Sequence, residues 1–385
     1  ASQSEVGRIH KYIALAYAAK IKLYQAYQQD ETTHAVTSIN KELLREVVSL
    51  CDQVTASNRY GLLDDFQGLD LVANENGKES VFAIQYSMND GTESAGRINW
   101  SNLLNSPGGG SPYGGDGFFL PSQDLINAYQ TDANGLPDFN YQSKSDYSWA
   151  VLNNGVYTLQ NTTPNVDPRL DFVVGRPTIT WKTYPDKPCE GWVRDKETYG
   201  YNCAKRFWVS PESSDMFNGW PWGASQLNWQ IIRYADILLW KAEALIELNE
   251  GDGLETARDL INQIRNRARN SAYVKDFNDH SKYAANYLVN PYPADVWNQD
   301  YARQALRWET RLEKALEGER FFDLVRWGIV ETTMNKYITA ESDNRIYYAN
   351  AHFTGGKDEY YPVPNNQYGF SGGKYVQNPG YAPFN

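Results

Sequence analysis

One stretch of the sequence, residues 306–328, constrains the fold more than any other. It reads LRWETRLEKALEGERFFDLVRWG. Leucines recur at helical intervals up to Gly318, which predicts an amphipathic helix whose narrow apolar stripe faces a core. After Gly318 comes an apolar block interrupted by charges, some of which must be covered and therefore need partners. The stretch supplies acids and arginines as candidates for such pairs: Glu309, Glu313, Glu317, Arg311, Arg320 and Arg326.

Helical periodicity also predicts two helix pairs. The first pair lies within residues 5–57, with helices over 12–27 and 41–55, and the second occupies residues 229–270. Both are antiparallel pairs of the tetratricopeptide kind. Because such a unit cannot cover its own apolar face, the pairs must stack on each other or on further helices. Two unrelated helical hairpins in an irregular fold are the alternative.

A long region between the pairs, residues 58–228, has little helical periodicity and is rich in Gly, Asn, Asp, Ser and aromatic residues. It is predicted to be a loop-rich lobe, and so long a loop region in a compact protein is usually functional. Asn76–Gly77 predicts a short hairpin, and Ser122 caps a short predicted helix over 125–129. The remaining C-terminal part, residues 271–385, contains the signature stretch and an Asn, Gly, Tyr and Pro rich tail.

Composition excludes several classes of function. With 385 residues and 41% hydrophobic content the chain can bury a sizeable core, and its net charge of -11 opposes binding to nucleic acid. The four histidines are scattered without a zinc or catalytic spacing, so we expect no metal and no cofactor. No apolar run is long enough to span a bilayer.

Paired carboxylates are the one catalytic arrangement that the sequence allows. Glu309, Glu313 and Glu317 have a spacing compatible with a glycoside hydrolase. Neighbouring arginines would keep all three ionised, which suits no general acid. A structural cluster of ion pairs is therefore the favoured interpretation, and the chain is predicted not to be an enzyme.

The chain has three cysteines. Cys51 lies among apolar residues of a predicted helix and is expected to be a buried, inert thiol. Cys189 and Cys203 are placed in a turn-rich segment where, in an oxidising compartment, they would close a loop with a disulfide worth about 3 kcal/mol. Two free thiols are the alternative.

The signature stretch resembles that of the SusD/RagB family, the surface lipoproteins that Bacteroidota use to capture nutrients beside a TonB-dependent transporter. Further segments resemble family landmarks, in family order: GDGFFLPSQDLINAYQTDANGLPD (115–138), DPRLDF (167–172), IIRYADILLWKAEALIELN (231–249), YYPVPNNQ (360–367) and QNPGY (377–381).

The resemblance implies a mostly α, SusD-like fold over residues 1–385, in which helix pairs form a scaffold packed against an irregular loop-rich lobe with short strands. It also implies a non-catalytic receptor that passes its ligand to a transporter of the SusC type. Family members begin with a lipidated cysteine and an N-terminal helical portion. We therefore expect an N-terminal part missing from this sequence and a lipid-anchored location on the extracellular face of the outer membrane.

Aromatic residues are unusually abundant, with 12 Trp, 28 Tyr and 14 Phe, many of them in the loops. Stacking a sugar ring on an aromatic plane contributes about 1 to 2 kcal/mol, so several exposed rings would bind a glycan. Burial of the rings inside the protein is the alternative. Two loop clusters supply the candidates: Arg97, Asn99, Trp100, Asn102 and Tyr113, and then Trp181, Tyr184, Trp192, Tyr199, Tyr201, Trp208, Trp220 and Trp222. The preferred ligand contacts are Arg97, Asn99, Trp100, Tyr113, Trp181, Trp220 and Trp222.

Three hypotheses about function follow. The leading one is a surface protein that binds oligosaccharides or polysaccharides. A peptide receptor, as in the RagB branch, would offer a groove with backbone partners in place of an aromatic platform. A glycoside hydrolase and a purely structural repeat protein are the remaining alternatives.

Overall fold

The computed structural model describes residues 5–93, 96–101, 105, 108, 110–147, 150–153, 156–159, 164–185, 188, 191–220 and 222–384. The α-helices are α1 Lys11–Ala26, α2 Lys41–Thr55, α3 Gln123–Ala128, α4 Arg169–Val173, α5 Lys196–Tyr199, α6 Tyr234–Leu248, α7 Gly253–Asn270, α8 Gln299–Glu313, α9 Arg320–Arg326, α10 Val330–Glu341 and α11 Asn365–Phe370. The strands are β1 Tyr27–Gln29, β2 Val36–Ile39, β3 Ser80–Ile84, β4 Gln130–Thr131, β5 Ala150–Asn153, β6 Val156–Leu159, β7 Asn165–Val166, β8 Val174–Gly175, β9 Cys203–Ala204 and β10 Trp229–Arg233.

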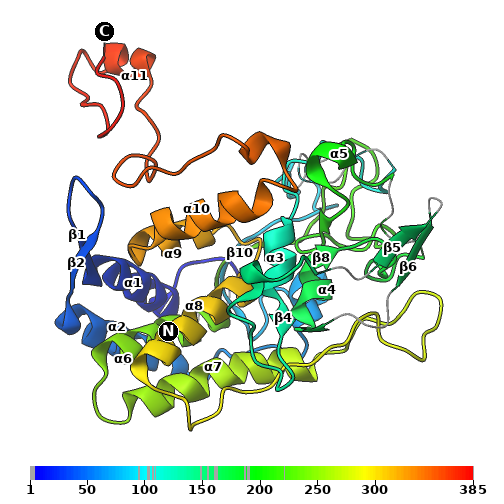
Figure 1. Ribbon diagram of the computed structural model, residues 1–385, viewed down its shortest axis with the longest axis horizontal. Coiled ribbons are helices and arrows are strands. Elements are labelled where there is room, and N and C mark those ends of the chain that lie inside the picture. Colours follow the sequence, from blue (N-terminus) through cyan, green and yellow to red (C-terminus); the bar gives the residue numbers. More distant parts are fainter. Residues whose placement is uncertain are drawn as a thin grey trace.

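Two helix pairs form the scaffold, and their existence and positions confirm the prediction from periodicity. Helix α1 packs on α2, and α6 packs on α7. The pairs stack directly, because α2 also packs on α6, while α8 covers α6 and α7 from another side (Figure 1). Helix α6 is thus the central helix, and it is buried on nearly all sides.

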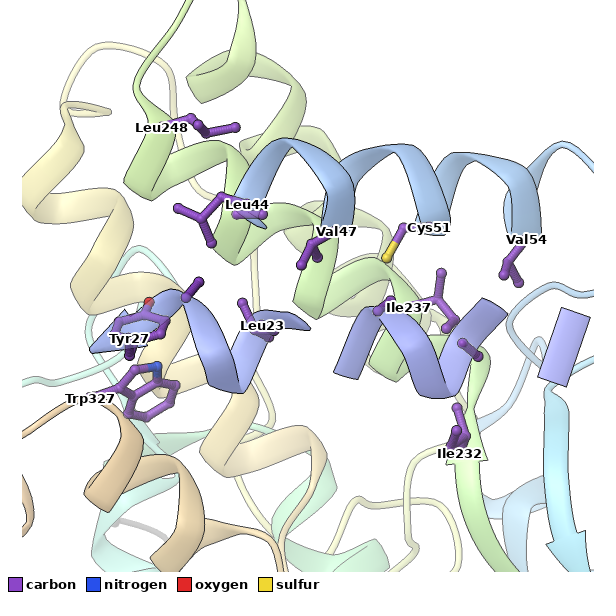
Figure 2. Close-up of a cluster of buried hydrophobic side chains, with 14 of the residues drawn as sticks. Leu23, Tyr27, Leu44, Val47, Cys51, Val54, Ile232, Ile237, Leu248 and Trp327 are labelled. Carbon is purple, nitrogen blue, oxygen red and sulfur yellow. The ribbon is translucent and has the colours of Figure 1, made fainter. Parts of the chain in front are cut away.

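Small side chains allow α1 to approach its neighbours closely. Its buried face includes Ala16, Ala19 and Leu23. Figure 2 shows Val47 and Cys51 of α2 pointing toward this face. Close packing of this kind leaves no room for larger groups. The predicted burial of Cys51 is confirmed, and the burial raises the pKa of its thiol to about 12.

The signature stretch forms two helices. Helix α8 presents its leucines to the core and ends at Glu313, earlier than the predicted end of the apolar stripe at Gly318. Leu316 and Gly318 then adopt positive φ angles, which turn the chain into α9. Beyond α9, the indole of Trp327 donates a hydrogen bond of 2.9 Å to Glu243 of α6 and so ties the stretch to the scaffold.

The loop-rich lobe holds most of the short strands, which pair in antiparallel twos among the described residues. The predicted hairpin at Asn76–Gly77 is wrong. The strand β3 pairs with β10, just before α6, and a 3-10 helix over Val72–Asn74 precedes the turn. The predicted short helix is confirmed as α3, whose first turn donates a backbone hydrogen bond to Ser122.

A buried network of ion pairs joins the lobe to the scaffold. Glu313 of α8 contacts Arg169 at 3.2 Å and Arg233 at 3.0 Å, and it also pairs with Arg267 of α7. Glu309 contacts Arg169 at 2.6 Å. The network confirms that the glutamates form a structural cluster, which we call the ionic core and define by Glu79, Asp167, Arg169, Arg233, Arg265, Arg267, Glu309, Glu313 and Glu317.

The predicted arginine partners of these glutamates are wrong. Arg311 pairs with Asp124 at 2.6 Å, and Arg326 pairs with Glu243 and Asp323. Arg320 forms no ion pair with any carboxylate in the described ranges. The reason is geometric, because the buried face of α8 looks toward α4, α7 and β10, which supply arginines from distant parts of the sequence.

The C-terminal arm, residues 355–384, reaches away from the body of the protein and includes α11 (Figure 1). Within the described ranges, no helix combines the length and the apolar character that crossing a membrane requires.

Candidate functional site

Three tryptophans are exposed on the surface of the loop-rich lobe. A short antiparallel pairing, with the amide of Phe217 donating to the carbonyl of Ala224 at 2.8 Å, brings Trp220 and Trp222 to an exposed turn. The amide of Asn99 donates to the carbonyl of Ser225 at 2.8 Å and places Trp100 beside this turn. Trp100, Trp220 and Trp222 are 46%, 64% and 52% exposed. We call these three residues the tryptophan surface.

A cavity of about 290 Å³ lies nearby, and half of its lining residues are aromatic. Tyr199 and Tyr347 have ring centroids 6.0 Å apart, and Tyr347 lies 4.5 Å from Tyr348. We call this cavity the aromatic pocket. Its lining consists of Asp116, Gly117, Phe118, Leu120, Ser122, Tyr199, Tyr337, Arg345, Tyr347 and Tyr348.

The loop from Gly114 to Phe118 connects the two features. The ring of Trp222 packs against Gly114, where a Cβ atom would lie 3.4 Å from the Cβ of Trp222. Phe118, four residues later, lines the aromatic pocket. Four residues span at most about 14 Å. The tryptophan surface and the aromatic pocket therefore lie at the two ends of one short loop, and we call them together the aromatic face.

Charged and hydrogen-bonding groups border the rings of the aromatic face. Arg194 donates to the carbonyl of Gly115 at 2.7 Å and pairs with Asp116 at 2.7 Å. Arg345 is largely buried and donates to the carbonyl of Thr198 at 3.4 Å. Flat apolar rings bordered by carboxylate and guanidinium groups suit a ligand that has flat C–H faces edged with hydroxyls.

Glu341 lies behind the aromatic pocket, at the end of α10. Its carboxylate accepts a hydrogen bond from the amide of Asp124 and lies 3.8 Å from Arg345. Burial raises the pKa of Glu341 to about 7, although the hydrogen bond from Asp124 opposes the shift. The group is 1% exposed, so it supports the pocket from inside.

Three of the predicted ligand contacts are buried, and the structure corrects them. Asn99, Tyr113 and Trp181 have at most 1% of their surface exposed. The indole of Trp181 donates to the hydroxyl of Tyr113 at 2.9 Å, and that hydroxyl donates to the carbonyl of Val209 at 2.6 Å. A side chain without exposed surface cannot stack on a ligand. These residues instead support the tryptophan surface from below, together with Trp192 and Trp208.

Close packing above this buried cluster explains why residue 223 is a glycine. A Cβ atom at Gly223 would lie 2.6 Å from the ring of Trp208, and its φ of +72° disfavours other residues. The exposed turn with Trp220 and Trp222 therefore rests directly on buried rings. Arg97 is exposed and pairs with Asp90 at 3.3 Å, whereas Asn102 lies outside the described residues.

Sequence reasoning missed half of the aromatic face. Phe118 belongs to the GFF segment, and Tyr347 and Tyr348 follow Arg345 in the tail. The only signal for the second group is the run Arg-Ile-Tyr-Tyr, an arginine beside two tyrosines in a polar loop.

The described residues contain no group of three or more His, Cys, Asp or Glu that could hold a metal ion. Cys203 is a buried free thiol whose sulfur lies 3.5 Å from the carbonyl oxygen of Gly175, and burial raises its pKa above the usual range. Cys189 lies outside the described residues, but the predicted Cys189–Cys203 disulfide is wrong, because Cys203 is a free thiol.

Fold and site together define an α-rich protein with a helical scaffold and an aromatic face on its loop-rich lobe. A model of the SusD family matches residues 78–381, and the chain belongs to this family. A search of curated proteins found no match.

Solved structures show the same fold at low sequence identity. A SusD superfamily protein from Bacteroides vulgatus is 21% identical with a TM-score of 0.60, and the alignment covers 95% of this chain and 61% of that one. A laminarin-binding SusD-like protein is 20% identical with a TM-score of 0.51 and coverages of 99% and 65%. Surface glycan-binding protein A from Bacteroides uniformis is 18% identical with a TM-score of 0.57 and coverages of 98% and 62%. The chain thus spans less than two thirds of the length of each.

Proposed function

We propose that this chain is a non-catalytic protein that binds oligosaccharides or polysaccharides at the cell surface. The aromatic face carries the proposal, because it offers three exposed indoles and a tyrosine-lined pocket edged by Arg194 and Asp116. Two structural neighbours are named for laminarin binding and for surface glycan binding, which agrees with this assignment.

The proposal includes a place and a partner. In it, the protein is lipid-anchored on the extracellular face of the outer membrane and passes its ligand to a TonB-dependent transporter of the SusC type. Membership of the SusD family supports both points. The helical scaffold would contact the transporter and leave the aromatic face open.

Isothermal titration against panels of glycans and of peptides tests the ligand class. We expect saturable binding to at least one glycan and about a five- to thirtyfold loss of affinity in Trp222→Ala, the loss of one stacked ring. Tyr361→Ala is the matched control, since Tyr361 is 91% exposed, lies on the C-terminal arm and is not one of the residues of the aromatic face.

Two results would overturn the proposal. Saturable heat with peptides alone would favour the peptide receptor. Release of reducing ends during long incubation with a bound polysaccharide, abolished by a single Asp or Glu substitution, would show a glycoside hydrolase.

A further inference from the structure

A second large cavity lies between the 3-10 helices after α2 and the segment that follows β9. Its volume is about 450 Å³, within the range of small-molecule sites. It shares no lining residue with the aromatic pocket. We call it the cationic pocket, and it is lined by Gln67, Asp70, Leu71, Val72, Phe172, Lys182, Thr183, Lys205, Arg206, Val209, Ser210, Glu212, Ser213 and Asp215.

The lining of the cationic pocket holds three cations, Lys182, Lys205 and Arg206, and three carboxylates, Asp70, Glu212 and Asp215. Lys182 and Arg206 share the single carboxylate of Asp70, at 3.2 and 3.1 Å. Arg206 also lies 3.4 Å from Glu317, which is already paired with Arg233 and Lys314. Asp70 and Glu317 thus pair with Lys182 and Arg206, and neither carboxylate pairs with Lys205.

Lys205 is the most isolated of the three cations. Its ammonium donates to the backbone carbonyls of Asp171 and Thr180, each at 2.8 Å, and it forms no ion pair with a carboxylate of the described chain. Asp171 itself is engaged by Arg176 at 2.8 Å. Burial lowers the pKa of Lys205 to about 7. A bound anion would oppose this shift and hold the ammonium in its charged form.

Lys182 adopts a backbone conformation that is unfavourable for lysine. Its φ is +48°, a conformation that favours glycine, and Phe207, beside Arg206, has a φ of +69°. Neither residue is glycine, asparagine or aspartate, the types that tolerate this region best. Strained conformations of this kind cluster at ligand sites.

The remaining lining is largely apolar, with Leu71, Val72, Phe172 and Val209. Three hydroxyl side chains also line it, those of Thr183, Ser210 and Ser213, and Thr183 donates to Ser210 at 2.7 Å. Asp215 accepts hydrogen bonds from Ser213 and Gln226, which hold its carboxylate in place but leave its negative charge. Glu212 is exposed and adds negative charge, which disfavours ligands with several negative charges.

We propose that the cationic pocket binds a small organic monocarboxylate, with its carboxylate at Lys182 and Lys205 and its apolar body against Phe172 and Val209. This site is separate from the proposed glycan site and does not depend on it.

Isothermal titration of the whole chain at pH 6.5 with 4-phenylbutanoate and with its neutral amide, 4-phenylbutanamide, tests the proposal. We expect saturable binding of the acid and at least about tenfold weaker binding of the amide, the loss of a hydrogen bond to a charged group. This comparison uses the unaltered protein and so does not depend on how a variant folds.

Variants locate the site. Lys182→Gln should weaken binding of the acid about tenfold. Lys182→Arg should retain most of the binding because it keeps the charge. Lys282→Gln, at an exposed lysine elsewhere, and Trp222→Ala should leave the affinity for the acid unchanged.

Three results would overturn the proposal: absence of saturable binding of the acid at millimolar concentration, equal affinity for acid and amide, or an unaltered affinity in a folded Lys182→Gln protein. Tighter binding of glucuronate, which has a polar body, would overturn the predicted apolar contact.

Discussion

At the scale of single residues, Glu313 shows how buried charge determines this structure. The side chain is fully buried and lies among Arg169, Arg233 and Arg267. Burial alone would raise the pKa of Glu313, but the three positive charges outweigh it and lower the pKa to about 2. The carboxylate is therefore ionised at any physiological pH and cannot serve as a general acid.

Removing this charge should destabilise the protein strongly. We expect Glu313→Gln to lower the free energy of unfolding by about 3–5 kcal/mol at pH 7, because it leaves buried arginines uncompensated. The carboxylate contributes stability above its unfolded-state pKa and loses it as pH falls toward about 2. The difference between the two proteins should therefore shrink between about pH 5 and pH 2, as measured by urea unfolding across this range.

Glu42→Gln is the control for this experiment, since Glu42 pairs with Arg45 in an exposed position. Exposed ion pairs contribute little, so its unfolding curve should nearly match that of the unaltered protein. Equal effects of the two substitutions would show that the ionic core contributes no more than a surface pair.

The sequence predicted that the charges near Glu313 need partners, but not which ones. Within a helix, only residues three or four positions away are predictable neighbours. The true partners of Glu313 come from α4, β10 and α7, and only the tertiary fold brings Arg169, Arg233 and Arg267 to one place.

At the scale of elements, the scaffold helices follow directly from periodicity. Each of α1, α2, α6 and α7 appears where leucines, valines and alanines repeat at helical spacing. The strands were harder to predict, because β3 pairs with β10, which follows in the sequence only after the whole loop-rich lobe. Asn76–Gly77 has the sequence of a hairpin turn, but among the described residues no strand precedes it that pairs with β3. The partner of β3 is instead β10, whose position depends on the packing of α6.

The alanine face of α1 should be intolerant of larger side chains. Ala19 is fully buried where α1 meets its neighbours. Ala19→Leu should lower the free energy of unfolding by about 1–3 kcal/mol, because a packed core cannot accept the added volume without strain. Ala14→Leu, at an exposed position of the same helix, should have little effect. Thermal unfolding followed by circular dichroism distinguishes them, and indistinguishable midpoints would contradict the packing argument.

At the scale of the whole molecule, the aromatic face is assembled from segments far apart in the sequence. Composition indicated that loop aromatics matter, and Trp100, Trp220 and Trp222 are indeed exposed. Composition could not indicate which rings are buried, because Tyr113 and Trp181 lie in loop sequences as polar and glycine-rich as those around the exposed tryptophans. Nor could it indicate that Tyr347, in the C-terminal part, joins Tyr199.

The two halves of the aromatic face lead to a prediction about ligand length. A short glycan can occupy either the tryptophan surface or the aromatic pocket, whereas a longer one can occupy both at once, because the connecting loop spans at most about 14 Å. For a long oligosaccharide, binding to the second half is intramolecular and raises the affinity without any new kind of contact. Affinity of the unaltered protein should therefore rise steeply once the glycan reaches both halves.

Trp222→Ala and Tyr347→Ala separate this mechanism from a single site. Each substitution should abolish most of the gain that lengthening gives, and the double substitution should bring long and short glycans to similar affinity. The reason is that a glycan bound to the remaining half has no second half to bind intramolecularly. The measurement is a titration series over glycans of increasing length. An affinity that rises with length equally in Tyr347→Ala and in the unaltered protein would show that the pocket takes no part, and that the tryptophan surface binds alone.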